Sequence, residues 1–184
     1  MPILSAEPSL FPENLFDGYV DEGLERRWWA IHTKSRQEKS LARQLLGMEV
    51  PFYLPLIPKT NLIRGRRFTS QIPLFGSYMF LFANERERVQ ALTTERIVQL
   101  LPSPSAQEIA QDLQNVRALI KAGAPLTLES RLAVGRRVRV KSGALIGLEG
   151  EIMSRRSGDH LLVSVRFLQQ GVSVLIRDFQ VEPI

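Results

Sequence analysis

The hydrophobic pattern of this 184-residue chain changes once, shortly after residue 121. Before that point, short apolar runs alternate with segments whose apolar residues recur at helical spacing, as in residues 105–120. In the last fifty residues the helical period disappears, and five short apolar runs are separated by glycines. The pattern therefore predicts an α+β chain in four parts. These are a flexible acidic leader over 1–25, a helix-covered antiparallel sheet over 26–121, a linker over 122–133 and a small β-barrel over 134–184.

The first folded part is predicted to run strand–helix–strand–strand–helix–strand–helix. Its expected strands are 28–33, 50–57, 72–82 and 97–101, and its helices are expected to start near Ser35, Asn84 and Ser105. Ser35 and Glu38 have the spacing of a capping box. In the second helix, Val89 and Leu92 are expected to face inward.

Composition excludes several classes of site. The chain has no cysteine, which excludes disulfides, thiol nucleophiles and thiolate metal sites, and its two histidines cannot form a three-histidine centre. No hydrolytic triad or phosphate-binding loop is present, so we expect a protein that is not an enzyme and has no cofactor or metal. The longest apolar stretch, 72–83, is too short to span a bilayer. The leader lacks a basic start, so we expect a cytoplasmic protein without a signal peptide or membrane partner.

Charge is distributed unevenly along the chain. Residues 1–25 contain only acidic charges, namely Glu7, Glu13, Asp17, Asp21, Glu22 and Glu25. The leader is therefore expected either to be a solvated tail or to compete with nucleic acid for a basic surface. The following segment, 26–67, is strongly basic. Arg64, Arg66 and Arg67 crowd a predicted hairpin tip that can reach a phosphate backbone, although such a run can also be only a solvated face.

Two predicted strands are apolar on both sides. Strand alternation places Trp28, Ala30 and His32 together, and in the same way Tyr78 and Phe80 share a side with Phe82. One side of the sheet must face the helices. The other side is then either an aromatic patch that binds a partner or a surface covered by another part of the chain.

Three segments together resemble the NusG-type transcription elongation factors, especially their specialised antitermination paralogues. The first, 28–39, reads WWAIHTKSRQEK and is similar to the family's opening strand and helix. The second, 73–82, reads PLFGSYMFLF and resembles the family's P-L-F-P-G-Y-x-F block, with Gly76-Ser77 in place of Pro-Gly. The third, 134–152, resembles a KOW motif that opens a small barrel.

The resemblance implies a ferredoxin-like NGN domain followed by an SH3-like KOW domain. The NGN domain of such factors binds the clamp helices of RNA polymerase and suppresses pausing or termination. By motif position, the polymerase-binding residues would be Trp28, His32, Phe75, Tyr78 and Phe80.

The resemblance also implies contacts with non-template or upstream DNA and with a second protein. Lys34, Arg36, Gln37 and Arg96 would lie toward the DNA. The KOW domain would recruit Rho or a small-subunit ribosomal protein through Ala144, Leu145, Ile146, Leu148, Phe167 and Leu168, and the factor would act as a monomer. The alternative is a ribosome- or RNA-binding KOW protein, which the basic residues of the barrel favour. These are Arg136, Arg137, Arg139, Lys141, Arg155 and Arg156.

Overall fold

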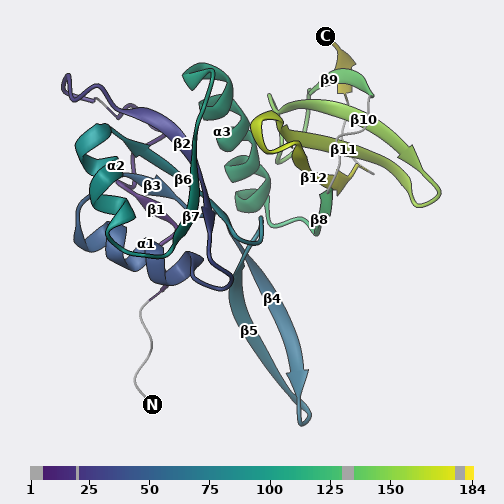
Figure 1. The fold of residues 1–184 in the computed structure, drawn as a ribbon. Coiled ribbons are helices and arrows are strands. Elements are labelled where there is room, and N and C mark those ends of the chain that lie inside the picture. Colours follow the sequence, from purple (N-terminus) through teal and green to yellow (C-terminus); the bar gives the residue numbers. More distant parts are fainter. Residues whose placement is uncertain (1–5, 20, 130–134, 177–180) are drawn as a thin grey trace. The chain divides into compact units, whose positions relative to one another are not determined.

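A computed structural model describes residues 6–19, 21–129, 135–176 and 181–184. The chain forms two compact units, Met1–Pro104 and Ser105–Ile184, and each is described here by itself. Figure 1 shows a helix-covered sheet in the first unit and a small sheet of curved strands in the second. The predicted α+β class is confirmed. No helix in the described parts of the chain is both long enough and apolar enough to cross a membrane.

The first unit is built on an antiparallel sheet in the order β1-β3-β6-β2-β7. Its strands are β1 (Leu10–Phe11), β2 (Arg27–Thr33), β3 (Phe52–Tyr53), β6 (Tyr78–Ala83) and β7 (Ile97–Pro102). Its helices are α1 (Glu38–Gly47) and α2 (Glu85–Leu92).

One face of this sheet forms the core under the two helices. Trp29 and Ile31 of β2 lie in a buried apolar cluster with residues of β6, α1 and α2. The Trp29 indole nitrogen also donates a hydrogen bond to the Ala83 carbonyl at 3.1 Å, which fixes the ring inside the cluster. Burial of this apolar area supplies the main driving force for folding the unit.

The predicted hairpin tip is the end of a much longer hairpin. Strands β4 (Leu56–Ile63) and β5 (Arg66–Pro73) pair along their whole length as a separate two-stranded sheet. The turn consists of Arg64 and Gly65, both at positive φ, as in the type I′ turns that match strand twist. The expected strands 50–57 and 72–82 are therefore each split into two strands. The hairpin follows β3 and precedes β6 along the chain, and it projects from the five-stranded sheet (Figure 1).

The predicted capping box at the start of α1 is wrong. The N-cap is Gln37, and no side chain caps this helix. Instead, the buried Glu38 carboxylate accepts a hydrogen bond of 2.6 Å from the Ser77 backbone N–H. Ser77 has a φ of 63°, so Glu38 stabilises a left-handed residue in the Gly76-Ser77 turn.

A capping box does form at α2, between Asn84 and Glu87, but the predicted inward face is wrong. Val89 and Leu92 are exposed, and Ala91 is the buried residue of this helix. A small residue fits where the helix approaches the sheet, so its larger neighbours face solvent.

The described part of the leader, residues 6–19 and 21–25, belongs to the fold and is not the flexible tail that its composition predicts. Its strand β1 pairs with β3, and Leu15 is buried. Phe16 stacks on Trp28, with ring centroids 5.6 Å apart, and meets Tyr53 edge-on. These contacts bury apolar side chains that an acidic, proline-rich segment was expected to leave in solvent.

The second unit contains an antiparallel sheet in the order β13-β9-β10-β11-β12-β8 and helix α3 (Ala106–Ala122). The sequence pattern predicts this helix at the end of the first folded part, whereas the structure groups it with the second unit. The strands are β8 (Leu126–Glu129), β9 (Arg136–Val140), β10 (Glu149–Arg155), β11 (Gly158–Val165), β12 (Gln170–Leu175) and β13 (Val181–Pro183), with a 3-10 turn at Arg166–Leu168. The segment expected to be a linker therefore contributes β8, which pairs with β12. The start of the predicted KOW motif at Val134 lies outside the described residues.

Gly150 allows two strands of the second unit to approach closely. A Cβ at this position would lie 2.4 Å from the Leu162 carbonyl oxygen and 2.9 Å from a Leu161 methyl carbon. Neither the backbone oxygen nor the packed leucine side chain can move far enough to make room for a methyl group. Gly150→Ala is therefore expected to destabilise the unit by about 3 kcal/mol.

Urea unfolding followed by far-UV circular dichroism measures this effect. The matched control is Gly76→Ala, where nothing lies within 4 Å of the added methyl group. Equal unfolding midpoints for the two variants would contradict the packing argument.

Candidate functional site

The second face of the first unit's sheet is aromatic. The β2–β6 register pairs Trp28 with Phe82, Ala30 with Phe80 and His32 with Tyr78, so these six side chains share one side. We call this surface, defined by these residues, the aromatic face. Trp28 and Tyr78 thus lie on one side of the sheet, as the alternation predicted.

The leader covers one end of the aromatic face. Phe16 stacks on Trp28, and Tyr19 meets Phe82 edge-on at 6.2 Å between ring centroids. Trp28 is consequently only 5% exposed. The covering segment is this chain's own leader, one of the two possibilities that the sequence left open.

The other end of the aromatic face holds a partly exposed pair. His32 and Tyr78 lie directly opposite each other in the register, and their rings stack with centroids 5.0 Å apart and planes 20° apart. A stacked pair of this kind offers a flat apolar surface with polar atoms at its edge. Phe75 and Phe80 meet edge-on beside the pair and are fully buried, so they can support its position but present no surface.

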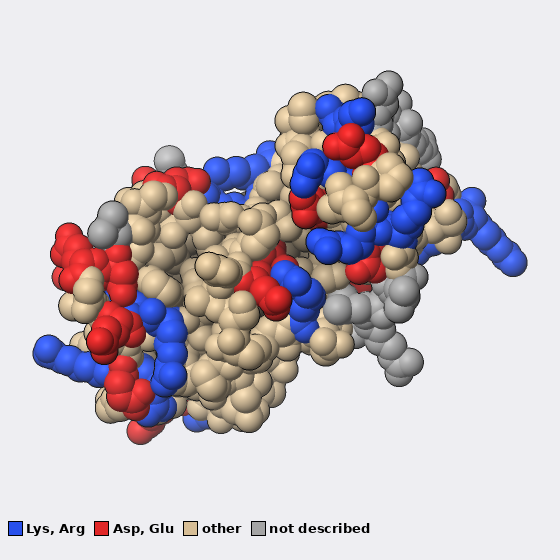
Figure 2. Space-filling view, turned by 90° about the horizontal axis from the view of Figure 1, so that it is seen from above, with Lys and Arg blue, Asp and Glu red and all other residues tan. Residues whose placement is uncertain are grey.

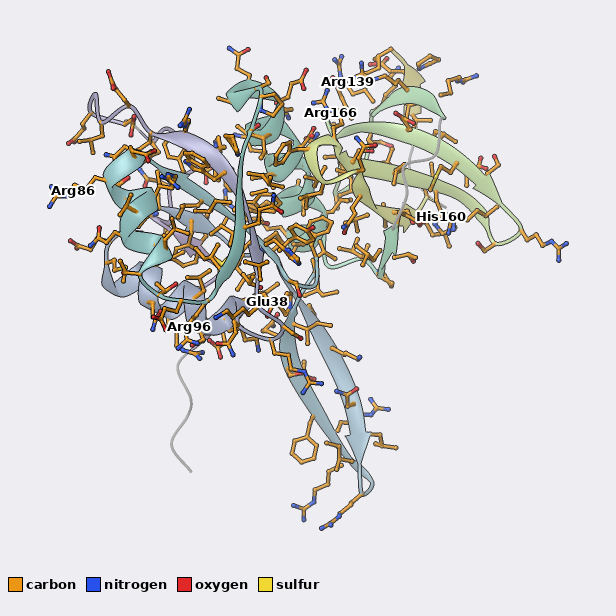
Figure 3. All side chains as sticks on the ribbon, in the orientation of Figure 1. Glu38, Arg86, Arg96, Arg139, His160 and Arg166 are labelled. Carbon is orange, nitrogen blue, oxygen red and sulfur yellow. The ribbon has the colours of Figure 1, made fainter. Side chains whose placement is uncertain are left out.

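A polar cluster lies where β2 ends and α1 begins. The Arg96 guanidinium donates hydrogen bonds to the side-chain oxygens of Gln37 and Gln44. The Lys34 backbone N–H donates to the Arg96 carbonyl at 2.8 Å. Figure 3 shows Arg96 beside α1. The structure therefore brings together Lys34, Gln37 and Arg96, with Arg36 exposed in a left-handed conformation beside them.

The hairpin arginines lie apart from this cluster, at the distal end of β4–β5. Arg64, Arg66 and Arg67 are exposed, and among the described residues none of them forms an ion pair. The predicted nucleic-acid residues thus form two separate groups rather than one surface.

A buried ion pair anchors the leader next to the aromatic face. The Arg26 guanidinium donates to the Glu87 carboxylate at 2.5–3.1 Å, and the two side chains are only 9% and 14% exposed. Arg26 also reaches Asp21 and the Tyr19 hydroxyl. Burial raises the pKa of Glu87, but hydrogen bonds from Arg26 and the Asn84 backbone outweigh it and hold that pKa below its usual range.

This ion pair predicts acid sensitivity of the first unit. Because the folded-state pKa of Glu87 lies below its unfolded value of about 4.3, its contribution is complete above that value and is lost as the pH falls through the folded pKa. Glu87→Gln is expected to lower the free energy of unfolding by about 2 kcal/mol near neutral pH. It should also flatten the acid limb of the stability profile.

Tryptophan fluorescence during urea unfolding measures this, because both tryptophans of the chain, Trp28 and Trp29, lie in the first unit. Glu13→Gln, a change at an exposed leader carboxylate, is the control. If the free energy of unfolding of Glu87→Gln and of the wild type fell equally steeply at acid pH, the stabilising role of the Arg26–Glu87 ion pair would be contradicted.

The barrel residues predicted to contact a partner divide into two groups. Leu145 and Leu148 are buried and therefore belong to the core of the second unit. Ala144 is exposed, and Ile146 is 69% exposed. Phe167 and Leu168 are half-buried in the 3-10 turn, so four of the six predicted residues remain available to a partner.

Most basic side chains of the barrel are paired with acids. Arg137 and Arg139 both contact Glu149, and salt bridges also join Lys141 to Glu182 and Arg155 to Glu129. The space-filling view in Figure 2 shows Lys and Arg side chains beside Asp and Glu. This pairing weakens the case for a phosphate-binding barrel surface.

Sequence reasoning missed an ion pair in the second unit. The buried Asp112 of α3 accepts hydrogen bonds from the Arg166 backbone N–H at 3.0 Å and from its guanidinium at 2.9–3.2 Å. The bonded carboxylate raises the pKa of Arg166 further. This contact lies beside a mixed-charge cavity of about 280 Å³ that is lined by residues of α3, β9, β10 and β11. Among the described residues, no three His, Asp or Glu side chains gather as metal ligands.

Comparison with known proteins gave a family match and matches to solved structures. Residues 26–123 match the family model described as "NusG: Transcription termination factor nusG". A solved structure titled "Domain interaction in Thermotoga maritima NusG" aligns at 18% identity with a TM-score of 0.48, covering 87% of this chain and 98% of that chain. No curated protein matches the chain.

Proposed function

The chain belongs to the NusG family of transcription termination factors, and we propose on that basis that it binds RNA polymerase and suppresses pausing or termination. In this proposal residues 26–121 act as the polymerase-binding NGN domain and residues 134–184 as the KOW domain. The observation that carries the proposal is the family match over the aromatic face, whose uncovered end is the His32–Tyr78 pair.

The stacked pair supports docking by burial. His32 and Tyr78 would lie against the clamp helices and contribute roughly 25 cal/mol per Å² of apolar area before the costs of association. Phe75 and Phe80 would hold the pair in position from the interior. Trp28 would contact the clamp helices only if Phe16 moved away from the Trp28 ring.

The polar cluster supports a contact with DNA beside the docked domain. Lys34 and Arg36 would bind phosphates of the non-template strand or of upstream DNA, while Gln37 and Arg96 hold each other in position. Such contacts give affinity that falls with salt and carry little sequence information.

The barrel would recruit a second protein, either Rho or a small-subunit ribosomal protein, through its exposed apolar residues. Ile146 is the most exposed of these, and Ala144, Phe167 and Leu168 lie with it among the predicted contacts. The proposed protein is a cytoplasmic monomer that makes and breaks no covalent bond. It acts by shifting polymerase between paused and active states.

Single-round transcription with purified RNA polymerase on a template with a defined pause tests this proposal. The full chain is expected to shorten the pause or to increase transcription through a terminator. An unchanged pause and unchanged termination at saturating protein would contradict it.

A further inference from the structure

We propose that the distal half of hairpin β4–β5 binds single-stranded DNA, with an unpaired base stacked on Phe68. The inference rests on the proposed function only for its choice of DNA over RNA, because that function already places the unpaired non-template DNA strand beside the first unit. The binding chemistry itself is argued from the hairpin.

The charge of the hairpin has one sign. Between Leu56 and Pro73 the sequence has four basic residues and no acidic one. The basic residues are Lys59, Arg64, Arg66 and Arg67, all exposed and all without an ion-pair partner among the described residues. An unneutralised basic ribbon of this kind attracts a polyanion.

The hairpin register places a half-exposed ring among these charges. Phe68 lies opposite Asn61, and its same-face neighbours along β5 are Arg66 and Ser70. The ring is 51% exposed, and none of the aromatic or cation–π contacts within the described residues includes it. An isolated exposed ring flanked by a cation, an amide and a hydroxyl offers a stacking surface, a phosphate contact and hydrogen bonds to a base edge.

The opposite face of the hairpin lacks this arrangement. It carries Thr60 and Thr69, whose hydroxyls bond to each other at 2.9 Å, and Leu62 opposite Arg67. Leu62 is more exposed than Phe68, at 71%, but has no aromatic ring on which a base can stack. The two faces therefore provide an internal comparison between base stacking and general apolar contact.

The exposed ring of Phe68, rather than the shape of the hairpin, favours an unpaired strand over a duplex. In a duplex the base faces are already stacked on each other, and a side chain can reach only their edges. An exposed aromatic ring gains most from a base whose face is free. Each strand of the hairpin has eight residues, so the hairpin is roughly 26 Å long. This length is enough to hold Phe68 away from the five-stranded sheet of the first unit.

Fluorescence anisotropy of the full chain with a labelled oligo(dT) of about 12 nucleotides tests the proposal. Phe68→Ala is expected to weaken binding by about tenfold, whereas Phe68→Trp keeps it, since base stacking is the interaction removed. Leu62→Ala is the matched control and should bind as the wild type does. Arg66→Ser with Arg67→Ser should reduce the slope of log affinity against log salt by about 0.7 for each lost phosphate contact.

Four results would overturn the proposal: no binding of oligo(dT), equal binding by Phe68→Ala and the wild type, equal binding of the matching duplex, or tighter binding of oligo(U). Polymerase binding by Phe68→Ala is measured in parallel and should be unchanged. If the wild type binds polymerase but not oligo(dT), this inference fails and the proposed function stands, whereas a wild type that does not bind polymerase counts against the proposed function.

Discussion

Removing residues 1–25 is expected to destabilise the first unit by about 4 kcal/mol or more. The deletion takes away strand β1, the buried side chain of Leu15 and the ring that stacks on Trp28. It also removes Tyr19 and Asp21 from the buried Arg26 guanidinium. Each of these losses leaves either a cavity, exposed apolar area or a weakened buried charge.

Urea unfolding followed by tryptophan fluorescence measures this loss, and quenching by acrylamide should rise as Trp28 becomes exposed. The control is deletion of residues 1–5 alone, which leaves β1 and Leu15 in place. An unchanged unfolding midpoint after removal of 1–25 would show that the leader is the solvated tail expected from its composition.

Replacing His32 and Tyr78 together by alanine is expected to weaken binding to core RNA polymerase by at least about 30-fold. The two rings form the uncovered end of the aromatic face, and central aromatic side chains dominate the energy of protein interfaces. Because both side chains are partly exposed, the double variant should unfold close to the wild-type urea concentration.

Biolayer interferometry with immobilised polymerase measures this loss of affinity. The matched control, Val89→Ala with Val98→Ala, removes two exposed apolar side chains from α2 and β7 and should bind normally. Equal losses in the two double variants would mean that no specific surface is involved.

The strands and the aromatic face could be predicted because their signals are local. Alternation in residues 28–33 and 78–82 defines two faces whatever the rest of the chain does. The length of the hairpin was harder to predict, because prolines at 51 and 55 interrupt the apolar runs that precede it.

The parts that sequence reasoning missed depend on contacts between distant residues. Leu15 and Phe16 have no periodic neighbours, and only the pairing of β1 with β3 makes them part of a core. Glu38 has capping-box spacing to Ser35, yet its bond goes to Ser77. Asp112 and Arg166 are 54 residues apart, and nothing in either local sequence indicates their pairing.

The orientation of α2 was predicted wrongly for a related reason. Spacing alone shows that Val89 and Leu92 lie on neighbouring helix positions, but it does not show which side approaches the sheet. The sheet accepts the small Ala91 there, so the choice depends on the distance between helix and sheet rather than on hydrophobicity.

Photo-crosslinking from position 78 tests the central claim most directly. A benzoyl-phenylalanine in place of Tyr78, in the full chain bound to transcribing polymerase, is expected to crosslink to the large subunit that carries the clamp helices. The same group in place of Val98 on the edge strand β7 should give no such product. A crosslink from position 98 but none from position 78 would contradict the claim that the His32–Tyr78 end of the sheet contacts the polymerase.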